Sequence, residues 1–210
     1  MVALDPRSQG ESQKVSEGHY PERRAQDIKE LIEQLKLAPA VVVGHSMAVS
    51  ELLAYVDQFG TGTLAGVVLV DASINPPELV DWIRELSMNR RHFLEQLTPQ
   101  FFKKPQPPEY FRRLIDGSMK TPTNTAVALL ASFQGRDFRP VLGKLDKPVL
   151  YTITPELKQD GEFLKAKAPK ARVEVFENSG HCLFVDEAER FNMLLEEFAR
   201  TAFAAESRRN

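Results

Sequence analysis

The chain has a single cysteine, Cys182, among its 210 residues, which excludes an internal disulfide framework. Scarce cysteine is typical of a protein from a reducing compartment, so we expect a cytoplasmic location. No apolar run approaches the roughly 20 residues that a membrane-spanning helix needs. Residues 1–7 are too short and too acidic for a signal peptide. The sequence therefore predicts no membrane association.

An excess of charge of one sign is also missing, because 27 Lys and Arg face 29 Asp and Glu, for a net charge of −2. Without a basic face or stripe, the chain has no electrostatic footprint for nucleic acid. The four histidines lack metal-ligand spacing, and no glycine-rich loop of the phosphate-binding kind occurs. We therefore expect no metal, no cofactor and no nucleic-acid partner.

The chain does contain short apolar runs with the composition of strands. They lie at residues 2–4, 41–43, 67–70, 148–153 and 172–176. Amphipathic helical patterns lie between or after them, at residues 21–35, 47–59, 156–168 and 187–204. Apolar strands that alternate with amphipathic helices predict an α/β fold with a mostly parallel sheet and helices on both faces. We expect 41–43 and 67–70 to be buried strands.

Residues 74–140 interrupt this rhythm, with many prolines and short helical patterns such as residues 79–86. The sequence predicts a core formed by 1–73 and 141–210, with 74–140 inserted as a helical cap. The insertion is aromatic, which indicates a small helical core, a lid over an apolar substrate pocket, or both. Its aromatic residues include Trp82, Phe93, Phe101, Phe102, Tyr110, Phe111 and Phe133.

Residues 44–48 read Gly-His-Ser-Met-Ala, between an apolar strand and a helical pattern. A sharp turn from strand to helix exposes the side chain of the turn residue at the top of a sheet. This arrangement is the nucleophile elbow, whose usual pattern is G-x-S-x-G. Ala48 stands where the last glycine is usual and adds a methyl group at a close approach of helix and strand. Ser46 is therefore the candidate nucleophile.

Taken together, these segments resemble the α/β-hydrolase superfamily over essentially the whole chain. Residues 4–12 look like the family's fourth strand and the loop after it, and residues 69–72 like the end of the sixth strand. Residues 180–186 look like the histidine loop before the last helix. The order of nucleophile, acid and histidine along the chain is the order that this fold requires.

The resemblance implies a serine triad. Ser46 would attack, and His181 would accept its proton, because a serine hydroxyl is a poor nucleophile without a base. The backbone N–H of Met47 would bind the oxyanion. His45 is expected to pack rather than react, and Cys182 to be a small buried apolar residue.

The acid that orients the histidine is less clear from the sequence. The family often supplies it after the seventh strand in a Gly-x-x-Asp pattern, which is absent from residues 154–160. Asp71 ends a strand beside the elbow strand, a position that some branches of the family use. Asp71 is our prediction, with Glu156 and Asp160 as alternatives.

The chain begins late compared with the family, which has three strands and a helix before the segment that residues 2–4 resemble. The lost part carries a loop that supplies one of two oxyanion N–H groups. Its absence would also leave the edge of strand 41–43 bare, unless strand 2–4 pairs with it directly or another chain or an upstream segment absent from this sequence covers it. We therefore expect a homo-oligomer or a truncated gene product.

These observations predict a serine hydrolase that cleaves an ester or related acyl bond of a small, partly apolar substrate. Two alternatives stay open. One is a truncated or catalytically weak remnant of the fold with a binding or interaction role, which Ala48 and the lost loop favour. The other is cofactor-free perhydrolase chemistry on the same triad.

Overall fold

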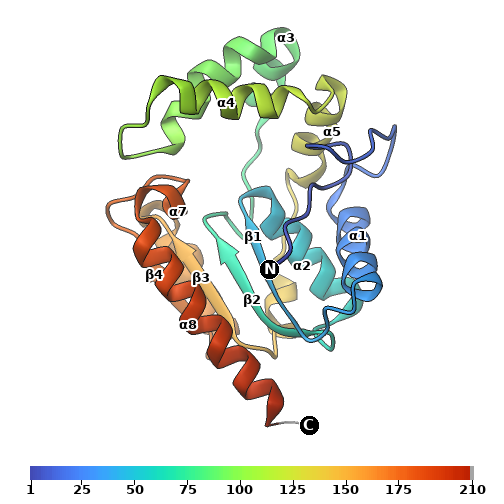
Figure 1. Ribbon diagram of the computed structural model, residues 1–210, viewed down its shortest axis with the longest axis vertical. Coiled ribbons are helices and arrows are strands. Elements are labelled where there is room, and N and C mark those ends of the chain that lie inside the picture. The colour runs from blue at the N-terminus through green and yellow to red at the C-terminus, as the bar shows by residue number, and fades with distance from the viewer. Residues whose placement is uncertain (209–210) are drawn as a thin grey trace.

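The computed structural model describes residues 1–208 and contains one sheet of four parallel strands, in the order β1-β2-β3-β4 (Figure 1). The strands are β1 (Ala40–His45), β2 (Leu64–Val70), β3 (Val149–Ile153) and β4 (Arg172–Val175). All three pairings are parallel, so the carboxyl ends of the strands meet at one edge of the sheet. This edge is where the candidate residues lie.

Helices cover both faces of the sheet, as the alternating pattern predicts. On one face, α1 (Pro21–Gln34), α2 (Met47–Phe59) and α6 (Lys158–Lys167) enclose a core with the inward residues of β2 and β3. On the other face lies α8 (Ala188–Ser207), which Figure 1 shows along the sheet. Gly66 of β2 permits this contact, because a Cβ there would lie 3.0 Å from the ring of Phe198.

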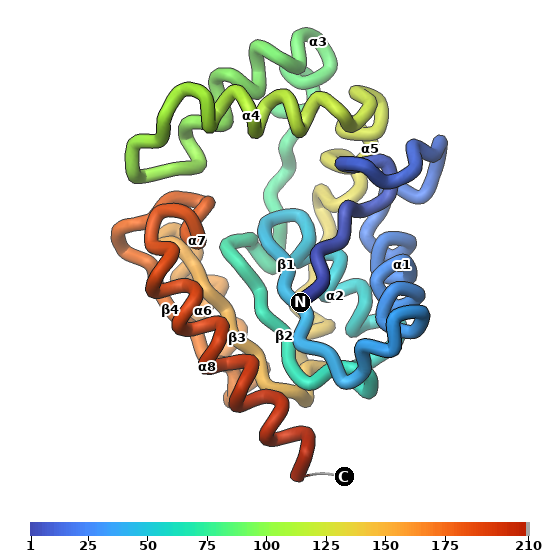
Figure 2. The backbone as a smooth tube through the Cα atoms, in the orientation of Figure 1, coloured from blue at the N-terminus to red at the C-terminus, as the bar shows by residue number. Residues whose placement is uncertain are grey.

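The segment between β2 and β3 forms α3 (Val80–Leu97), α4 (Pro108–Met119) and α5 (Thr123–Phe133). Short 3-10 turns, η1 (Thr98–Phe101) and η2 (Arg139–Lys144), follow α3 and α5. The two views show α3 and α4 together beyond one end of the sheet, above the strands in the orientation drawn (Figures 1 and 2). We propose to treat residues 74–140 as a cap on a core of 1–73 and 141–210.

The expectation of a strand at residues 2–4 is wrong. Val2 and Leu4 are 50% and 41% exposed and belong to no strand. The reason is local, because the run is only three residues long and leads into a polar loop that Asp5 holds. Its carboxylate accepts the Glu11 N–H at 2.8 Å, and its carbonyl accepts the Ser12 hydroxyl. Direct pairing of this segment with β1 is therefore wrong as well.

The expectation that residues 41–43 form a buried strand is only partly right. Among the residues described, β1 pairs with β2 alone, so its other edge is bare. Val41 packs against the core beneath α8, but Val43, two residues further on the same face, is 48% exposed. Strand β1 is therefore a half-buried edge strand.

Most of the remaining boundaries differ little from the predicted ones, but the helical pattern at 79–86 continues to Leu97 in α3. The helical pattern at 156–168 begins as a 3-10 turn, η3 (Pro155–Leu157), before α6. A short helix, α7 (Leu183–Asp186), precedes α8 and was not predicted. Across the described part of the chain, we find no helix with the length and apolar character needed to span a bilayer.

Candidate active site

Ser46 lies at the turn between β1 and α2 in a backbone conformation that few non-glycine residues adopt, with φ 56° and ψ −127°. Its backbone N–H donates to the carbonyl of Val70 at 2.9 Å, which ties the turn to β2. The helix begins at the next residue, so the turn is as sharp as the elbow motif predicts.

Gly44 makes this turn possible. A Cβ at Gly44 would lie 2.8 Å from Leu52 Cδ1 and 2.9 Å from the carbonyl oxygen of Ala48. The tight contact with residue 48 is thus made by its backbone, which any residue carries. The elbow therefore forms with alanine at this position.

Asp71 lies at the end of β2, is 4% exposed and has a positive φ of 43°. Its Oδ2 accepts a hydrogen bond from His181 Nδ1 at 2.8 Å, and its Oδ1 accepts the Thr154 N–H at 2.7 Å. Because an ionised carboxylate only accepts, Nδ1 carries the proton of the neutral ring, and Nε2 is left as the basic nitrogen of the imidazole. The structure thus joins Asp71, at the end of β2, to His181, in the loop after β4, across 110 residues of sequence.

The two alternative acids lie elsewhere. Glu156 is exposed on η3, where it lines the same cavity as His181. Asp160 lies on α6 and contacts Ser73 and the backbone of Ile74, and burial raises the pKa of its carboxyl. Within residues 1–208, neither carboxylate makes a hydrogen bond with His181, so the geometry favours Asp71.

His45 packs against His181, as the sequence predicts, with the ring centroids 4.5 Å apart. Its Nε2–H donates to the backbone carbonyl of His181 at 3.0 Å. Burial, together with the nearby His181, lowers the pKa of His45 to about 4. His45 is therefore neutral near pH 7, and it holds the histidine loop through a bond that sequence reasoning missed.

Asp186 is a second residue that the sequence analysis missed. It is 2% exposed, and its Oδ2 accepts the N–H groups of Gly180 and Lys103, each at 2.8 Å. Its Oδ1 accepts the N–H of Lys104 at 3.1 Å. One carboxylate thus joins the histidine loop to the segment that connects η1 with α4. No local sequence pattern predicts this role, since the backbone groups of Lys103 and Lys104 belong to a distant loop.

The same two segments make further contacts. The N–H of Cys182 donates to the carbonyl of Phe101 at 2.9 Å, and a Cβ at Gly180 would lie 2.7 Å from that oxygen. The ring of Phe101 lies 5.1 Å from that of His181. The cap segment is therefore packed directly against the histidine.

Cys182 is half-buried, not fully buried as the sequence analysis expects. Burial raises the pKa of the thiol to about 12, so the thiolate is scarce near pH 7.

A cavity of about 630 Å³ lies between the sheet edge and the cap. Ser46, Met47, Asp71 and His181 line it from the core side. The cap lines it mostly with apolar side chains, which include Trp82, Leu86, Phe93, Leu94, Leu97, Phe101, Leu129, Leu130 and Phe133. Another aromatic group within the insertion packs on itself and consists of Phe102, Tyr110 and Phe111. The insertion therefore forms a small aromatic cluster of its own and also an apolar wall of the cavity.

Two details bear on what the cavity can do. Ser46 and His181 share its wall, yet no hydrogen bond joins them in the described part of the chain. Met47 is the first residue of α2, where backbone N–H groups have no acceptor within the helix. An anion bound beside Ser46 would find this donor. In residues 1–208 no group of three or more His, Cys, Asp or Glu is arranged to hold a metal ion.

Comparison with known proteins agrees with this arrangement. The family described as "Alpha/beta hydrolase family" matches residues 1–194. The chain belongs to this family. Its relatives include a bifunctional esterase/perhydrolase, and the protein is an enzyme of hydrolase type.

The relatives extend beyond the length of this chain. The AB hydrolase superfamily protein YisY of Bacillus subtilis is 24% identical over 95% of this chain and 81% of its own length. Non-heme chloroperoxidase CPO-A1 of Kitasatospora aureofaciens is 27% identical over 94% and 81%. The esterase EaEST from Exiguobacterium antarcticum has a TM-score of 0.85 at 24% identity, over 93% of this chain and 79% of that one. The similarity to this esterase structure shows the fold of the chain.

Proposed function

We propose that the protein is a serine hydrolase that cleaves an ester or related acyl bond through Ser46, His181 and Asp71. The hydrogen bond between Asp71 and His181, at the wall of a cavity that Ser46 also lines, is the observation that carries the proposal. The three side chains come from the ends of β1 and β2 and from the loop after β4, which the parallel sheet brings to one edge.

The chemistry follows from these groups. Ser46 Oγ attacks the acyl carbon while His181 Nε2 takes its proton, and the Met47 N–H stabilises the oxyanion. The tetrahedral intermediate collapses as His181 returns the proton to the departing alkoxide, which leaves as the alcohol. Water then attacks the acyl-enzyme by the same proton transfers and releases the acid with free Ser46. Asp71 fixes the imidazole tautomer and stabilises the imidazolium.

The cavity supports a small, partly apolar substrate. Its volume suits a small molecule, and its cap wall offers aromatic and aliphatic side chains to an acyl or alcohol chain. The reacting bond would lie at the polar wall, where Ser46 and His181 are found.

A fluorophosphonate probe tests the nucleophile, because it phosphonylates an activated serine. We expect Ser46 to be the labelled residue in peptide mapping, and Ser46→Ala to abolish both labelling and hydrolysis of short p-nitrophenyl esters. The control is Ser87→Ala, which removes an exposed hydroxyl on α3. Equal ester rates for wild type and Ser46→Ala would instead favour a remnant of the fold with a binding role.

A perhydrolase activity is the second candidate, and the comparisons favour it. The bifunctional esterase/perhydrolase DCH of Acinetobacter calcoaceticus is 28% identical over 71% of this chain and 61% of its own length. In that reaction hydrogen peroxide, instead of water, would attack the acyl-enzyme and release a peracid and free Ser46. Peracid formation that depends on peroxide and disappears in Ser46→Ala would establish this activity.

A further inference from the structure

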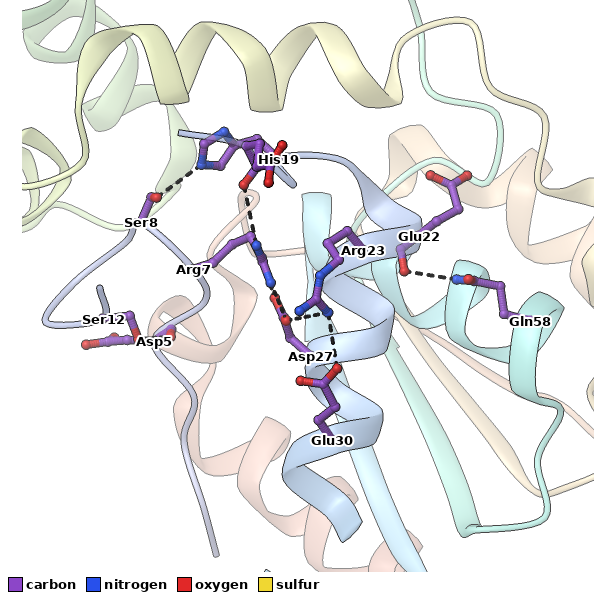
Figure 3. Close-up of polar contacts among 11 residues, drawn as sticks. Asp5, Arg7, Ser8, Ser12, His19, Glu22, Arg23, Asp27, Glu30 and Gln58 are labelled. Atoms are coloured by element: carbon purple, nitrogen blue, oxygen red, sulfur yellow. Dashed lines mark hydrogen bonds and ion pairs between the residues drawn. The ribbon is translucent and has the colours of Figure 1, made fainter. Parts of the chain in front are cut away.

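The N-terminal loop, residues 5–19, is held in a fixed conformation beside α1 (Figure 3). Arg7 donates to both carboxylate oxygens of Asp27, at 2.6 and 2.5 Å. Ser8 is fully buried, and its hydroxyl lies 3.0 Å from His19 Nε2. The Ser8 hydroxyl also bonds both backbone groups of Val15, so this Ser–His pair ties the loop together and faces no cavity.

Gln9 follows Ser8 on this loop and lines the cavity together with Ser46 and Met47. Its side-chain oxygen Oε1 accepts a hydrogen bond from Arg24 Nη2 at 2.6 Å. A guanidinium only donates, so the amide orientation is settled by chemistry: the oxygen faces Arg24 and the NH₂ group faces away.

Arg24 is itself well fixed. It is 3% exposed, and its Nη1 lies 2.8 Å from the carboxylate of the buried Glu51 on α2. The bond from this buried guanidinium favours one orientation of the Gln9 amide. In the described residues Gln9 Nε2 has no acceptor of its own, and an N–H donor beside a reaction cavity is most useful when a ligand satisfies it.

We propose that Gln9 is a substrate-binding residue, whose Nε2–H donates a hydrogen bond to an oxygen of the ester bound against Ser46. The inference rests on the proposed function. It adds a fixed side-chain donor to the single backbone donor, Met47, that the elbow provides. Arg24 is then a positioning residue, which acts through Gln9.

Gln9→Glu is the sharpest test, because it keeps an acceptor for Arg24 and removes the donor. We expect kcat/KM for p-nitrophenyl esters to fall about 10- to 100-fold, as for loss of one hydrogen bond to a reacting oxygen. For Gln9→Met, whose side chain has a similar length but neither donor nor acceptor, kcat/KM should fall at least as far. Thermal unfolding of both variants checks that the fold is retained.

A purely structural role for Gln9 gives a different pattern. Gln9→Glu would then keep wild-type kcat/KM because its bond to Arg24 is preserved, and that result would overturn the inference. The control Gln100→Glu changes a glutamine that is exposed on η1 and should leave the rate unchanged. If Ser46→Ala loses activity and Gln9→Glu does not, only the proposed role of Gln9 is contradicted. If Ser46→Ala keeps full activity, the proposed function itself is contradicted.

Discussion

Single residues decide the chemistry, and Asp71 is the most informative of them. Asp71→Asn would keep the bond to the Thr154 N–H but would offer an NH₂ group to His181 Nδ1. The imidazole would then carry its proton on Nε2 and could not act as a base. We expect kcat to fall by about 10³- to 10⁴-fold, measured with p-nitrophenyl esters.

Asp160→Asn is the matched control for this prediction, because Asp160 is partly buried and is one of the two alternative acids. It should keep most of the activity. A large loss in Asp160→Asn with a small loss in Asp71→Asn would reverse the assignment of the acid.

The sequence leads to the residues of the proposed triad because each lies at a recognisable end of a strand or in a glycine-containing loop. Ser46 and His181 could be placed from these patterns, and Asp71 could be preferred but not separated from Glu156 and Asp160. The contributions of Gln9 and Asp186 could not be predicted. Both proposed roles depend on side-chain hydrogen bonds between separate segments of the chain, which only the folded structure brings together.

At the scale of the elements, the contact between β1 and α2 depends on Gly44. A methyl group there meets both Leu52 and the backbone of Ala48, so one of the two elements must move. We expect Gly44→Ala to lower the free energy of unfolding by about 1–3 kcal/mol, measured by urea denaturation. Gly62→Ala, with no atom near its new methyl group, should change stability little. Equal effects at the two glycines would contradict this account.

The Asp186 carboxylate, which joins the histidine loop to the cap segment, gives a second prediction at this scale. In Asp186→Asn, one side-chain oxygen is replaced by an NH₂ group that faces backbone donors. We expect a loss of about 1–3 kcal/mol in the free energy of unfolding, together with a fall in kcat, because His181 loses its support. The exposed change Glu177→Gln should alter neither quantity by much. Wild-type kcat in a folded Asp186→Asn would show that Asp186 does not position His181.

Elements with a strong apolar pattern could be predicted from the sequence. Elements that depend on contacts with another segment of the chain could not. Strands β2 and β3 are buried on both faces, and their composition marks them clearly. Residues 2–4 have similar composition, but without a neighbouring strand they remain an exposed segment. The short helix α7 arises from the loop that Asp186 closes and leaves no periodic pattern in four residues.

For the whole molecule, the buried pair of Arg24 and Glu51 makes stability depend on pH. Burial outweighs the attraction of Arg24 and raises the pKa of Glu51 to about 7, from an ordinary value of 4.5. Between these values the folded protein holds a proton that the unfolded chain has released. Raising the pH through this window therefore destabilises the fold, and the whole penalty is present above pH 7.

Glu51→Gln removes this titration. We expect its unfolding free energy to improve relative to wild type by on the order of 1–3 kcal/mol between pH 5 and pH 8. Urea denaturation at both pH values measures the difference, with Glu33→Gln, an exposed carboxylate on α1, as control. If the unfolding free energies of Glu51→Gln and wild type differ by the same amount at both pH values, the raised pKa of Glu51 is contradicted.

Because one edge of β1 has no partner strand among the described residues, a homo-oligomer remains a prediction. Exposed backbone groups on such an edge can pair with another strand, and Val43 adds exposed apolar surface. We expect sedimentation velocity to detect self-association that weakens in Val43→Lys, since a charge on an edge strand opposes pairing. A single monomeric species at all concentrations would exclude it.

The carboxylate of Asp186 has a consequence for attempts to change what this enzyme accepts. Residues 103 and 104 belong to the proposed cap and residue 180 precedes the proposed base, yet one side chain accepts hydrogen bonds from the backbone of all three. Exchange of the cap for that of a relative would therefore disturb the histidine loop unless the new segment presents the same N–H groups to Asp186. A graft that ends before residue 101 keeps these donors in place.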